Sequence, residues 1–568
     1  MKRLLLIIWF CLWAQSAFAV TAWVDTNGAA AWGDCQGAEK TGASACSYST
    51  ANTNADAGDT VNFQGGTYTI NSGNGIDPTN SGSSGNVITF TAYNSESVEF
   101  VATHSNGIGV HLNNDDYIKV HGIKFSDWYK PLRITSGEYN EISYSTFEGC
   151  CGGDQTQGDW VGSRIRTGST YNWVHGCSFS NYGYFDPNDN NVVFGVGIEE
   201  TNDGSMYNLI EDNHFFHGGH HVVDVNGKLN VWRNNYIRND AWSNYGGTDY
   251  SNRVLFTAGS WSTHNIGRTL FEGNRVAYGQ ECADDEVGGS GGSWSSDYHI
   301  VRHNVFYQNY LYGMYIVSYT GLTASYMRIY NNTFWYNGHS PTGPLKGYWG
   351  DDLSHGLTIN EDADTVDNHF VNNLFYDNQD DCSGSPGPLI ESNCTVPDNQ
   401  TLRNNWTSGD PSFVDISGTP TPSLIETQFD FTLQPSSGAI DNGGRLTDVA
   451  TGDDCNGGTG CDTTVEVDDA GYFFDGWTMA AAIPSATIEA DWICIGTVLN
   501  CAQISSINYT TNVITLASAL DRNDGDDVWL YKDSEGTQVL YGTTPDQGAY
   551  EYGAGSTPTN TITGVNIN

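Results

Sequence analysis

The feature that most restricts the fold of this chain is a repeated Asn-x-apolar pattern in its middle part. Neighbouring copies stand as few as 22 residues apart, from Phe215 to Ile237, and about 40 apart where longer loops intervene. A minimal unit of this length, with short apolar runs and Asn-containing turns, is typical of one coil of a solenoid. The strong copies are Asn213-His-Phe215, Asn235-Tyr-Ile237, Asn274-Arg-Val276, Asn304-Val-Phe306, Asn332-Thr-Phe334 and Asn373-Leu-Phe375, and weaker copies end at Phe125, Phe147 and Phe179.

Two further positions repeat in register with this pattern. An apolar residue stands five positions before the end of each copy, and Asn is frequent seven positions before it. Strands of stacked coils pair at about 4.8 Å, so we expect apolar columns in the interior and Asn columns that satisfy backbone groups at the bends. The apolar positions are Val120, Ile142, Val174, Ile210, Trp232, Phe271, Val301, Ile329 and Phe370, and the Asn positions are Asn140, Asn172, Asn208, Asn230 and Asn368.

The repeat predicts an all-β protein built as a right-handed single-stranded parallel β-helix over residues 61–408. Leucine-rich repeats would show a leucine spacing that is missing, and a β-propeller would have a longer period with Trp-Asp marks. Residues 20–60 are expected to form an N-terminal cap with a short helix that covers the open end of the core. Alternating apolar and polar residues predict a small β-rich insertion at about 450–540.

The chain begins with a segment typical of a secretory signal over residues 1–19. Lys2 and Arg3 precede an apolar run too short to span a bilayer, and Ala17 and Ala19 form a small-residue cleavage site. We therefore expect an extracellular or periplasmic protein, either free or attached to the cell surface, with no membrane insertion after removal of the signal. Four close cysteine pairs fit disulfides in an oxidising compartment, and the partners of four other cysteines are left open. The pairs are Cys35/Cys46, Cys382/Cys394, Cys455/Cys461 and Cys494/Cys501, and the others are Cys150, Cys151, Cys177 and Cys282.

The charge of the chain is strongly negative but unevenly distributed. A formal net charge of −44 argues against binding to nucleic acid or to an anionic membrane surface. Most basic residues after the signal lie between Lys119 and Lys346, so this part of the chain is where an anionic ligand would be held. We expect a monomer without an organic cofactor.

Several segments resemble known secreted proteins. The segments "GDTVNFQGGTYTI" (58–70), "GNVITFTAYN" (85–94) and "YIKVHGIKFSDW" (117–128) resemble the pectate-lyase-like superfamily of bacterial right-handed parallel β-helix proteins. The segments "GDPSFVD" (409–415), "DFTLQPSSGAIDNG" (430–443) and "PDQGAYEY" (545–552) resemble the C-terminal module called choice-of-anchor Q. This resemblance implies a C-terminal region over 409–552, followed by a flexible tail over 553–568. The superfamily includes lyases, hydrolases, epimerases and adhesins, so the resemblance implies a fold and not one reaction.

One strand of successive coils is predicted to carry an outward column of ionisable residues. A purely structural face would carry Thr, Ser and Asn, whereas this column mixes arginines, carboxylates, imidazoles and tyrosines, with Ile165, Ile198, Val223 and Leu255 as approximate inward partners. We interpret the column as a ligand groove, and the alternative is that Gly218-Gly219-His220-His221 is an ordinary turn. The candidate catalytic residues are His221, Lys228, Arg253 and Asp224, the candidate substrate-binding residues are Arg164, Arg166, His217, His220, Tyr315 and Tyr319, and the candidate calcium ligands are Glu199, Glu200 and Asp224.

These residue types suit the cleavage of a uronic-acid polysaccharide by β-elimination. The reaction requires Arg or Ca²⁺ to neutralise the uronate carboxylate and a base to remove the adjacent C5 proton. Arginines of the column would neutralise the carboxylate, and His221 or Lys228 would be the base. Zinc is not expected, because His220 and His221 are adjacent and would point to opposite sides of a strand.

The segment "VVDVNGKLNVWRNN" (222–235) resembles the core coil of alginate and chondroitin lyases of the β-helix type. It departs from that family at two chemically important positions. Asn226 stands where the family's catalytic lysine is expected, and His221 stands in place of a calcium-binding glutamate. The family's site is therefore not transferred to this chain.

Two other functions fit parts of the pattern. A glycoside hydrolase needs two carboxylates about 5–10 Å apart, which Glu199 and Asp224 on neighbouring coils would supply, whereas Asp284 and Asp285 are expected in a solvated Gly-rich loop. A non-catalytic adhesin would instead stack sugars on loop aromatics; the candidates are Trp242, Trp261, Trp294, Trp335 and Trp349. A separate column of alternating charge is expected to form a solvent-exposed ladder without a catalytic role; it contains His175, Glu211, Arg233, Glu272 and Arg302.

Overall fold

The computed structural model describes most of the stacked strands and the C-terminal region of the chain. The described residues are 19–150, 163–181, 199–200, 205–216, 221–224, 227–238, 254–257, 266–278, 284–287, 296–309, 313–318, 324–338, 356–359, 366–378, 389–391, 399–407, 409–417, 429–455, 461–479 and 483–554. The predicted signal segment, Cys382 and Cys394 therefore lie outside the described residues, as do the candidate site residues Arg253, His217, His220 and Tyr319.

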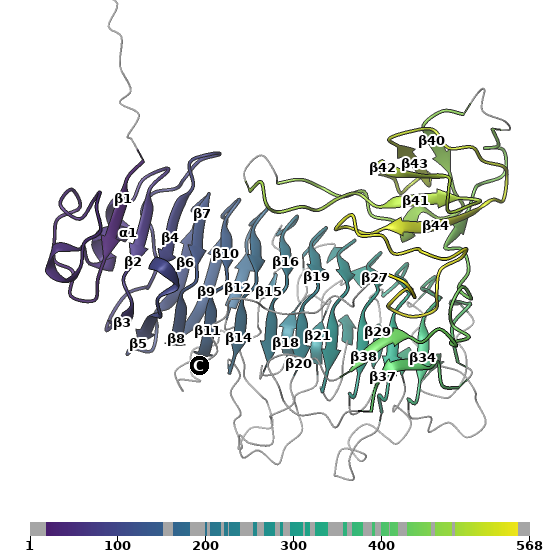
Figure 1. Cartoon of the computed structure of the whole chain (residues 1–568), viewed down its shortest axis with the longest axis horizontal. Coiled ribbons are helices and arrows are strands. Elements are labelled where there is room, and N and C mark those ends of the chain that lie inside the picture. Colours follow the sequence, from purple (N-terminus) through teal and green to yellow (C-terminus); the bar gives the residue numbers. More distant parts are fainter. Residues whose placement is uncertain are drawn as a thin grey trace, which may run out of the picture.

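Three parallel sheets, which we call A, B and C, run along the molecule (Figure 1), and from β4 onward the chain visits them in that order in each coil. Sheet A contains β1 (Thr21–Val24), β2 (Thr60–Phe63), β4 (Ile88–Ala92), β7 (Ile118–His121), β10 (Glu141–Ser143), β13 (Trp173–His175), β16 (Leu209–Glu211), β19 (Val231–Arg233), β23 (Leu270–Glu272), β27 (Ile300–Arg302), β30 (Arg328–Tyr330), β33 (His369–Val371) and β36 (Thr401–Arg403). Sheet B contains β3 (Gly66–Ile70), β5 (Val98–Ala102), β8 (Lys124–Trp128), β11 (Thr146–Cys150), β14 (Ser178–Ser180), β17 (His214–Phe216), β20 (Tyr236–Arg238), β24 (Arg275–Ala277), β28 (Val305–Tyr307), β31 (Thr333–Trp335) and β34 (Leu374–Tyr376). Sheet C contains β6 (Ile108–Asn113), β9 (Lys130–Thr135), β12 (Ser163–Arg166), β15 (Glu199–Glu200), β18 (His221–Asp224), β21 (Val254–Thr257), β25 (Asp284–Val287), β29 (Met314–Ser318), β32 (Leu357–Ile359) and β35 (Leu389–Glu391).

This arrangement is a right-handed parallel β-helix, so the predicted fold class is confirmed. At its N-terminal end, the helix α1 (Tyr48–Asn54) lies in the segment between β1 and β2. Ser47 caps this helix, because its side chain accepts a hydrogen bond from the backbone N–H of Thr50. Two short 3-10 helices, η1 (Gly42–Ser44) and η2 (Tyr93–Ser95), also lie in this part of the chain.

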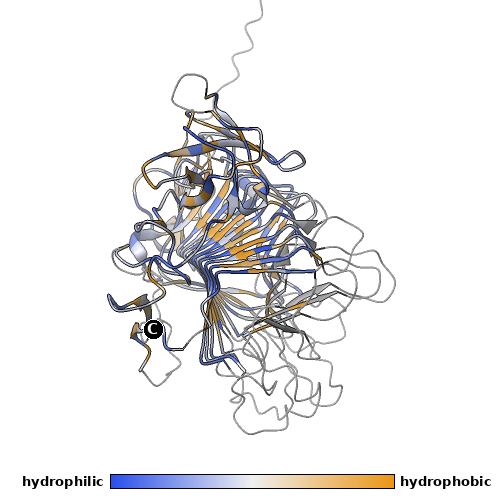
Figure 2. Ribbon diagram, turned by 90° about the vertical axis from the view of Figure 1, so that its right-hand side faces the viewer, coloured by the Kyte–Doolittle hydropathy of each residue, from blue (hydrophilic) through white to orange (hydrophobic). Residues whose placement is uncertain are grey.

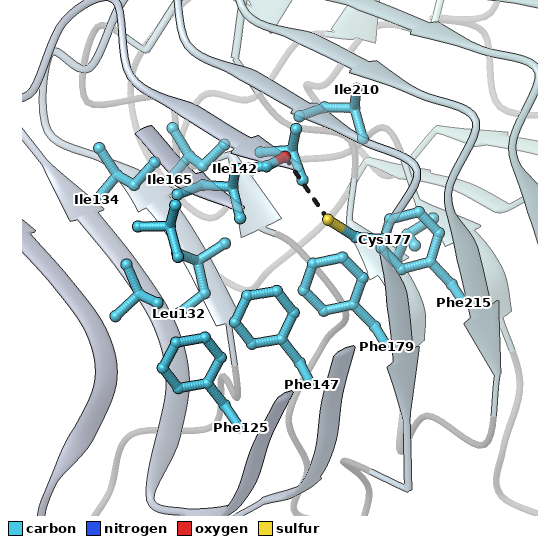
Figure 3. Packing of buried hydrophobic residues seen from close by; sticks show 14 of the residues in the cluster. Phe125, Leu132, Ile134, Ile142, Phe147, Ile165, Cys177, Phe179, Ile210 and Phe215 are labelled. Carbon is cyan, nitrogen blue, oxygen red and sulfur yellow. Dashed lines mark hydrogen bonds between the residues drawn. The ribbon is translucent and has the colours of Figure 1, made fainter. Parts of the chain in front are cut away.

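The interior is filled by the columns that the repeat predicts. Phe125, Phe147, Phe179 and Phe215 stack ring on ring in sheet B, with centroids 5.3, 4.7 and 5.0 Å apart (Figure 3). The apolar column of sheet A is buried throughout, from Val120 to Phe370. Viewed along the axis, apolar residues of successive coils overlap in the interior (Figure 2). This burial of repeated apolar side chains is the main source of stability for the helix.

Asn ladders satisfy the backbone at the bends, as predicted. In the ladder between sheets A and B, the backbone N–H and the Nδ2 of Asn235 both donate to Oδ1 of Asn274, each at 2.9 Å. Asn274 donates in the same way to Oδ1 of Asn304, at 2.8 and 3.1 Å. A second ladder, which enters sheet A, joins Asn140, Asn172 and Asn208 by the same paired bonds. Each bend therefore buries its polar groups with partners in the next coil.

The residue that precedes the ladder position at the entrance to sheet A adopts a left-handed backbone conformation, whether that position holds Asn or, in some coils, another residue. These residues form a column, which we call the turn column, at the entrance to sheet A. Such positive φ values are uncommon outside Gly, Asn and Asp, yet several Tyr and one Arg adopt them here. The turn column contains Tyr117, Tyr139, Tyr171, Tyr207, Leu229, Arg268, Tyr298, Tyr326 and Asp367.

The C-terminal region packs on the outside of the helix (Figure 1). The strands β37 (Phe413–Asp415) and β38 (Asp430–Leu433) form an antiparallel pair beside sheet B, where Phe431 contacts Tyr307 and Trp335. A six-stranded antiparallel sheet, which we call the module, contains β39 (Thr447–Asp448), β40 (Thr464–Glu466), β41 (Trp492–Ile495), β42 (Cys501–Asn508), β43 (Val513–Leu516) and β44 (Asp527–Lys532), with η5 (Ala470–Tyr472) in the segment after β40. The predicted β-rich insertion is thus present.

The module covers the column of alternating charges on sheet A, so the prediction that this column is solvent-exposed was wrong. Arg302 is completely buried, and its guanidinium bonds Glu272 in the neighbouring coil and Asp491 in the module. Arg233 is 3% exposed and donates to Glu211 and to the backbone carbonyls of Thr487 and Ser534. The column is a buried polar interface rather than a surface ladder.

Three of the predicted disulfides are present: Cys35–Cys46, Cys455–Cys461 and Cys494–Cys501. Cys177 is a buried free thiol that donates to the carbonyl oxygens of His175 and Ile142, at 3.3 and 3.6 Å (Figure 3). Among the described residues, no helix is long and apolar enough to cross a membrane.

Candidate functional site

The strands of sheet C place a line of polar residues in register across successive coils, which we call the sheet C row. Arg164 is paired with Arg133 on one side and with Glu199 on the other, and Glu199 is paired with Asp224. Paired residues of parallel strands lie about 4.8 Å apart, so the row brings cationic and anionic positions into one line. The row is His111, Arg133, Arg164, Glu199, Asp224, Thr257, Asp284, Tyr315 and Thr358, and the next paired position is the apolar Ile390.

At its N-terminal end the row faces outward. Arg133 and Arg164 are half-buried, whereas Ile134 and Ile165, one position further along the strands, are completely buried in the core. Arg133 Nε donates to Oγ1 of Thr135 at 3.3 Å. This alternation follows from the two-residue period of a strand, which puts successive side chains on opposite faces.

His111, the first residue of the row, is held by Asp77 and Asn74. Its Nδ1 lies 3.0 Å from Oδ1 of Asp77 and 3.1 Å from Nδ2 of Asn74. Burial alone would raise the pKa of Asp77, but the hydrogen bonds from His111 and Asn74 outweigh it and lower the pKa. The first coil of the row thus holds an ionised carboxylate next to an imidazole.

The pairing separates the two neighbouring glutamates that were predicted to bind calcium together. Glu199 is in the sheet C row, whereas Glu200 is paired with the buried Ile165. Arg166 follows Arg164 by two positions in β12, and its Nε donates to Oγ1 of Thr167 at 3.1 Å. Tyr315 belongs to the row, in β29.

The two candidate bases lie in different parts of the coil. His221 begins β18, three positions before Asp224. The strand ends at Asp224, Gly227 has a φ of 99°, and the exposed Lys228 pairs with Met206 and Gly267 in the bend that leads to sheet A. Lys228 is therefore outside the sheet C row.

The structure corrects three details of the sequence interpretation. Asp284 and Asp285 lie in the strand β25 rather than in a loop, and Asp284 is in the row. Val223 pairs with Phe256 rather than Leu255, a one-residue shift of the kind that long connecting loops allow. Trp335 is buried against Phe429 and Phe431, so it is not an exposed loop aromatic.

Sequence reasoning missed His111 and Arg133, which continue the row toward the N-terminus. Aligning the apolar run around Ile134 with that around Ile165 would have placed Arg133 in the same column as Arg164. The signal was weak because these coils are separated by 31 residues, and the Asn-x-apolar pattern identifies strands of sheets A and B rather than sheet C.

No cluster of three or more metal-ligating side chains occurs among the residues whose side chains the structure describes. The side chains of Glu199, Glu200 and Asp224 are not among these, so the calcium prediction rests on strand positions. Glu199 and Asp224 occupy paired positions of the neighbouring strands β15 and β18.

The arrangement of the row could position an acidic sugar chain along sheet C. Arginine positions at Arg133 and Arg164 would attract a carboxylate, and the neighbouring Glu199 and Asp224 could hold a cation or accept a proton. Because the whole chain carries a net charge of −44, such a ligand would need this local cationic end.

Comparisons with known proteins find similarity at the level of solved structures. No family model matches the sequence, and no curated protein matches it. The pectate lyase Pel9A is 15% identical with a TM-score of 0.43, and the match covers 75% of this chain and 92% of that chain. A rhamnogalacturonan lyase is 14% identical with a TM-score of 0.42, covering 73% and 96%. A PL6 family polysaccharide lyase from Pseudopedobacter saltans is 12% identical with a TM-score of 0.38, covering 68% and 97%. These similarities assign neither a reaction nor a catalytic residue to this chain.

Proposed function

We propose that this protein is a secreted enzyme that cleaves a uronic-acid-containing polysaccharide by β-elimination along the sheet C row. The observation that carries the proposal is the uninterrupted pairing of Arg164 with Glu199 and of Glu199 with Asp224. A column that only stabilised the strands would be expected to repeat small polar residues, as the Asn ladders do at the bends. This column instead changes from cationic to anionic within one coil.

In this proposal, Arg133 and Arg164 bind the uronate carboxylate and withdraw charge from it. Their positions in adjacent coils suit successive acidic groups or the two oxygens of one carboxylate. Neutralising the carboxylate makes the neighbouring C5 proton more acidic, because the negative charge that develops on proton removal is stabilised. Arg166 would contact the same chain farther along β12, and Arg253, His217, His220, Tyr315 and Tyr319 stay candidates for the remaining contacts and roles.

We propose His221 as the base that removes the C5 proton. His221 is the first residue of β18, three positions before Asp224, so it does not share the strand face of Asp224 and would act from the end of the strand. The imidazole is the side chain most often used as a general base near neutral pH. Lys228 is the second choice, since it lies in the bend outside the row. The electron pair of the C5–H bond forms a C4–C5 double bond in the new terminal sugar, the C4–O bond breaks, and the leaving oxygen takes up a proton from water.

Glu199 and Asp224 are the residues that would hold a calcium ion, if one participates. Bound there, the ion would supply positive charge for a substrate carboxylate. Glu200 is less suited to this role, because it is paired with the buried Ile165 instead of Arg164. We also propose that the C-terminal region is a choice-of-anchor Q module. The protein would act as a monomer outside the cytoplasm.

The proposal is tested by incubating the full chain with pectate, alginate and glycosaminoglycans, with and without added Ca²⁺. β-Elimination produces unsaturated uronates that absorb ultraviolet light, so a rise in absorbance with one polymer is the expected result.

The second candidate is glycoside hydrolysis, since the spacing of paired strands is close to the carboxylate separation of retaining enzymes, about 5–5.5 Å. New reducing ends without absorbance would favour hydrolysis, and no cleavage of any polymer would favour a non-catalytic glycan-binding protein.

A further inference from the structure

A cavity of about 300 Å³ lies between the turn column and the module, apart from the sheet C row. We call it the module pocket. Its helix side is lined by Arg268, Tyr298 and Tyr326 from three successive coils of the turn column. Its other side includes Asp468 and Tyr509 from two segments of the module.

The guanidinium of Arg268 lies between two tyrosine rings of the pocket. It lies 4.7 Å from the ring centroid of Tyr298 and 3.8 Å from that of Tyr509. Among the described residues, this guanidinium makes no hydrogen bond or ion pair with a protein group. Burial lowers the pKa of Arg268 although Tyr509, Tyr298 and Asp475 act in the opposite direction, so an anion beside the guanidinium would offset part of the cost of burial.

Arg328, the other arginine of the pocket wall, is already paired with two carboxylates. Arg328 Nε donates to Oδ2 of Asp469 at 2.7 Å, and Arg328 Nη2 donates to Oδ2 of Asp367 at 3.2 Å. His369 lies 3.0 Å from Asp367 through Nε2 and 2.6 Å from the hydroxyl of Tyr472 through Nδ1. Arg268 is therefore the cation left to meet a ligand, and the exposed Asp468 can accept hydrogen bonds from ligand hydroxyls.

Two tyrosines of the pocket stack face to face, so their faces meet each other and their edges are left at the pocket wall. The rings of Tyr298 and Tyr326 stack at 4.9 Å with an interplanar angle of 10°, and these residues are 41% and 36% exposed. Earlier in the turn column, where Tyr171 and Tyr207 also stack, Trp477 from the module lies beside both rings at 5.9 Å. No aromatic ring of this kind lies beside the Tyr298–Tyr326 stack among the described residues, so a sugar ring could pack against the edges of these two rings as Trp477 does against the earlier pair.

We propose that the module pocket is a second carbohydrate site that binds one uronate residue of an acidic glycan. The sugar ring packs against the edges of Tyr298 and Tyr326, its carboxylate accepts hydrogen bonds from Arg268, and its hydroxyls donate to Asp468. This site rests on the proposed function for its substrate class but uses no residue of the sheet C row. It would hold a polysaccharide on the protein between cleavage events and so increase the affinity for long chains.

The test is isothermal titration calorimetry, which measures the dissociation constants of the full chain for trisaccharides of galacturonic acid and of mannuronic acid, and for their methyl esters. The esters keep the sugar rings but lack the negative charge. All titrations use the Arg164→Gln background, in which binding at the sheet C row is weakened. Arg268→Gln is compared with Arg445→Gln, which removes an exposed arginine paired with Asp527 on the module.

We expect Arg268→Gln to weaken binding of at least one acidic trisaccharide by roughly ten- to a hundred-fold, the usual effect of losing a charged hydrogen bond. The methyl ester should bind weakly, and with equal affinity, to the background chain and to the Arg268→Gln chain. Tyr326→Ala should weaken the binding of the acid and of the ester to the same extent. Arg445→Gln should leave the affinity for both ligands unchanged. Equal binding of the acid by the Arg268→Gln and background chains would overturn the proposal, as would the absence of binding to either acid. Because no turnover is measured, these results are independent of whether the chain cleaves a polymer.

Discussion

Arg302 and Asp491 form a bidentate ion pair between the β-helix and the module, with Nη1–Oδ2 and Nη2–Oδ1 distances of 2.6 and 2.7 Å. Both side chains are fully buried, and the two residues are 189 positions apart in the sequence. Arg302 also contacts Glu272 in the preceding coil. One guanidinium thus serves two carboxylates and joins the two parts of the molecule.

Replacing Arg302 with Met should strongly destabilise this interface. The change leaves Glu272 and Asp491 buried without their shared cation, and breaking a buried ion pair from one side costs about 3–5 kcal/mol. Urea unfolding at neutral pH measures the effect. Arg445→Met is the control, because Arg445 is 43% exposed and surface ion pairs contribute about 0–1 kcal/mol. Equal stabilities for the two variants would contradict a structural role for the buried pair.

The destabilisation caused by Arg302→Met should also decrease in acid. Arg302 lowers the pKa of Glu272 against the effect of burial, so Glu272 contributes stability above its unfolded pKa and loses this contribution as the pH falls through its lowered value. In the variant this contribution is missing at every pH. The difference in unfolding free energy between wild type and variant is therefore largest at neutral pH and smallest at low pH.

Glu141 should make the stability of the chain depend on pH between about 2 and 4.5. Burial alone would raise its pKa, but hydrogen bonds from His175 and Lys119 lower it from 4.5 to about 2. A lowered carboxyl pKa adds stability that is complete above the unfolded value and is lost as the pH falls toward 2. Glu141→Gln should cost about 2 kcal/mol at pH 7 and flatten this part of the stability profile. The more exposed Glu148, which pairs with Lys124 at 2.8 Å, is the control position for the same Gln substitution.

Asn274→Ala should be among the more costly single changes in the helix. Asn274 accepts two hydrogen bonds from Asn235 and donates to the carbonyl of Trp232, so the truncation leaves several buried groups without partners. With about 1–3 kcal/mol for each orphaned group, a loss of at least about 3 kcal/mol is expected in denaturant unfolding. Asn71→Ala, at an exposed turn, should change the stability by no more than about 0.5 kcal/mol. A loss below 1 kcal/mol at Asn274 would show that the ladder contributes little.

Cys177 should be inert in the folded protein. It takes the ladder position that Asn213 takes in the next coil, and burial raises the pKa of its thiol to about 12. Because the thiolate is the reactive form, iodoacetamide should leave Cys177 unmodified at neutral pH until urea unfolds the chain. Peptide mass spectrometry detects the modification. Rapid labelling without denaturant would contradict the burial of this residue.

The sequence predicted the features that recur with each coil and missed those that depend on distant segments. The Phe and Asn columns could be predicted because each coil repeats the same interior and the same bend, as Phe147, Phe179 and Asn235 show. The burial of Arg302 could not, because the cover comes from a segment 189 residues away. The pairing register in sheet C was predicted only approximately, because the number of residues between successive strands of this sheet varies. The sequence spacing therefore does not reveal that Arg133, Arg164, Glu199 and Asp224 are paired in one row.

The most direct test of the proposed function is the initial rate of ultraviolet absorbance increase on the polymer that the wild-type chain cleaves, measured for Arg164→Gln, Asp224→Asn and Arg445→Gln. If the sheet C row performs the elimination, the first two variants lose at least about ten-fold in kcat/KM, in line with the loss of one charged contact, and Arg445→Gln retains the wild-type rate. If Arg164→Gln and Asp224→Asn cleave the polymer as fast as the wild type while unsaturated products still form, the reaction takes place elsewhere on the protein and the assignment of the row is wrong.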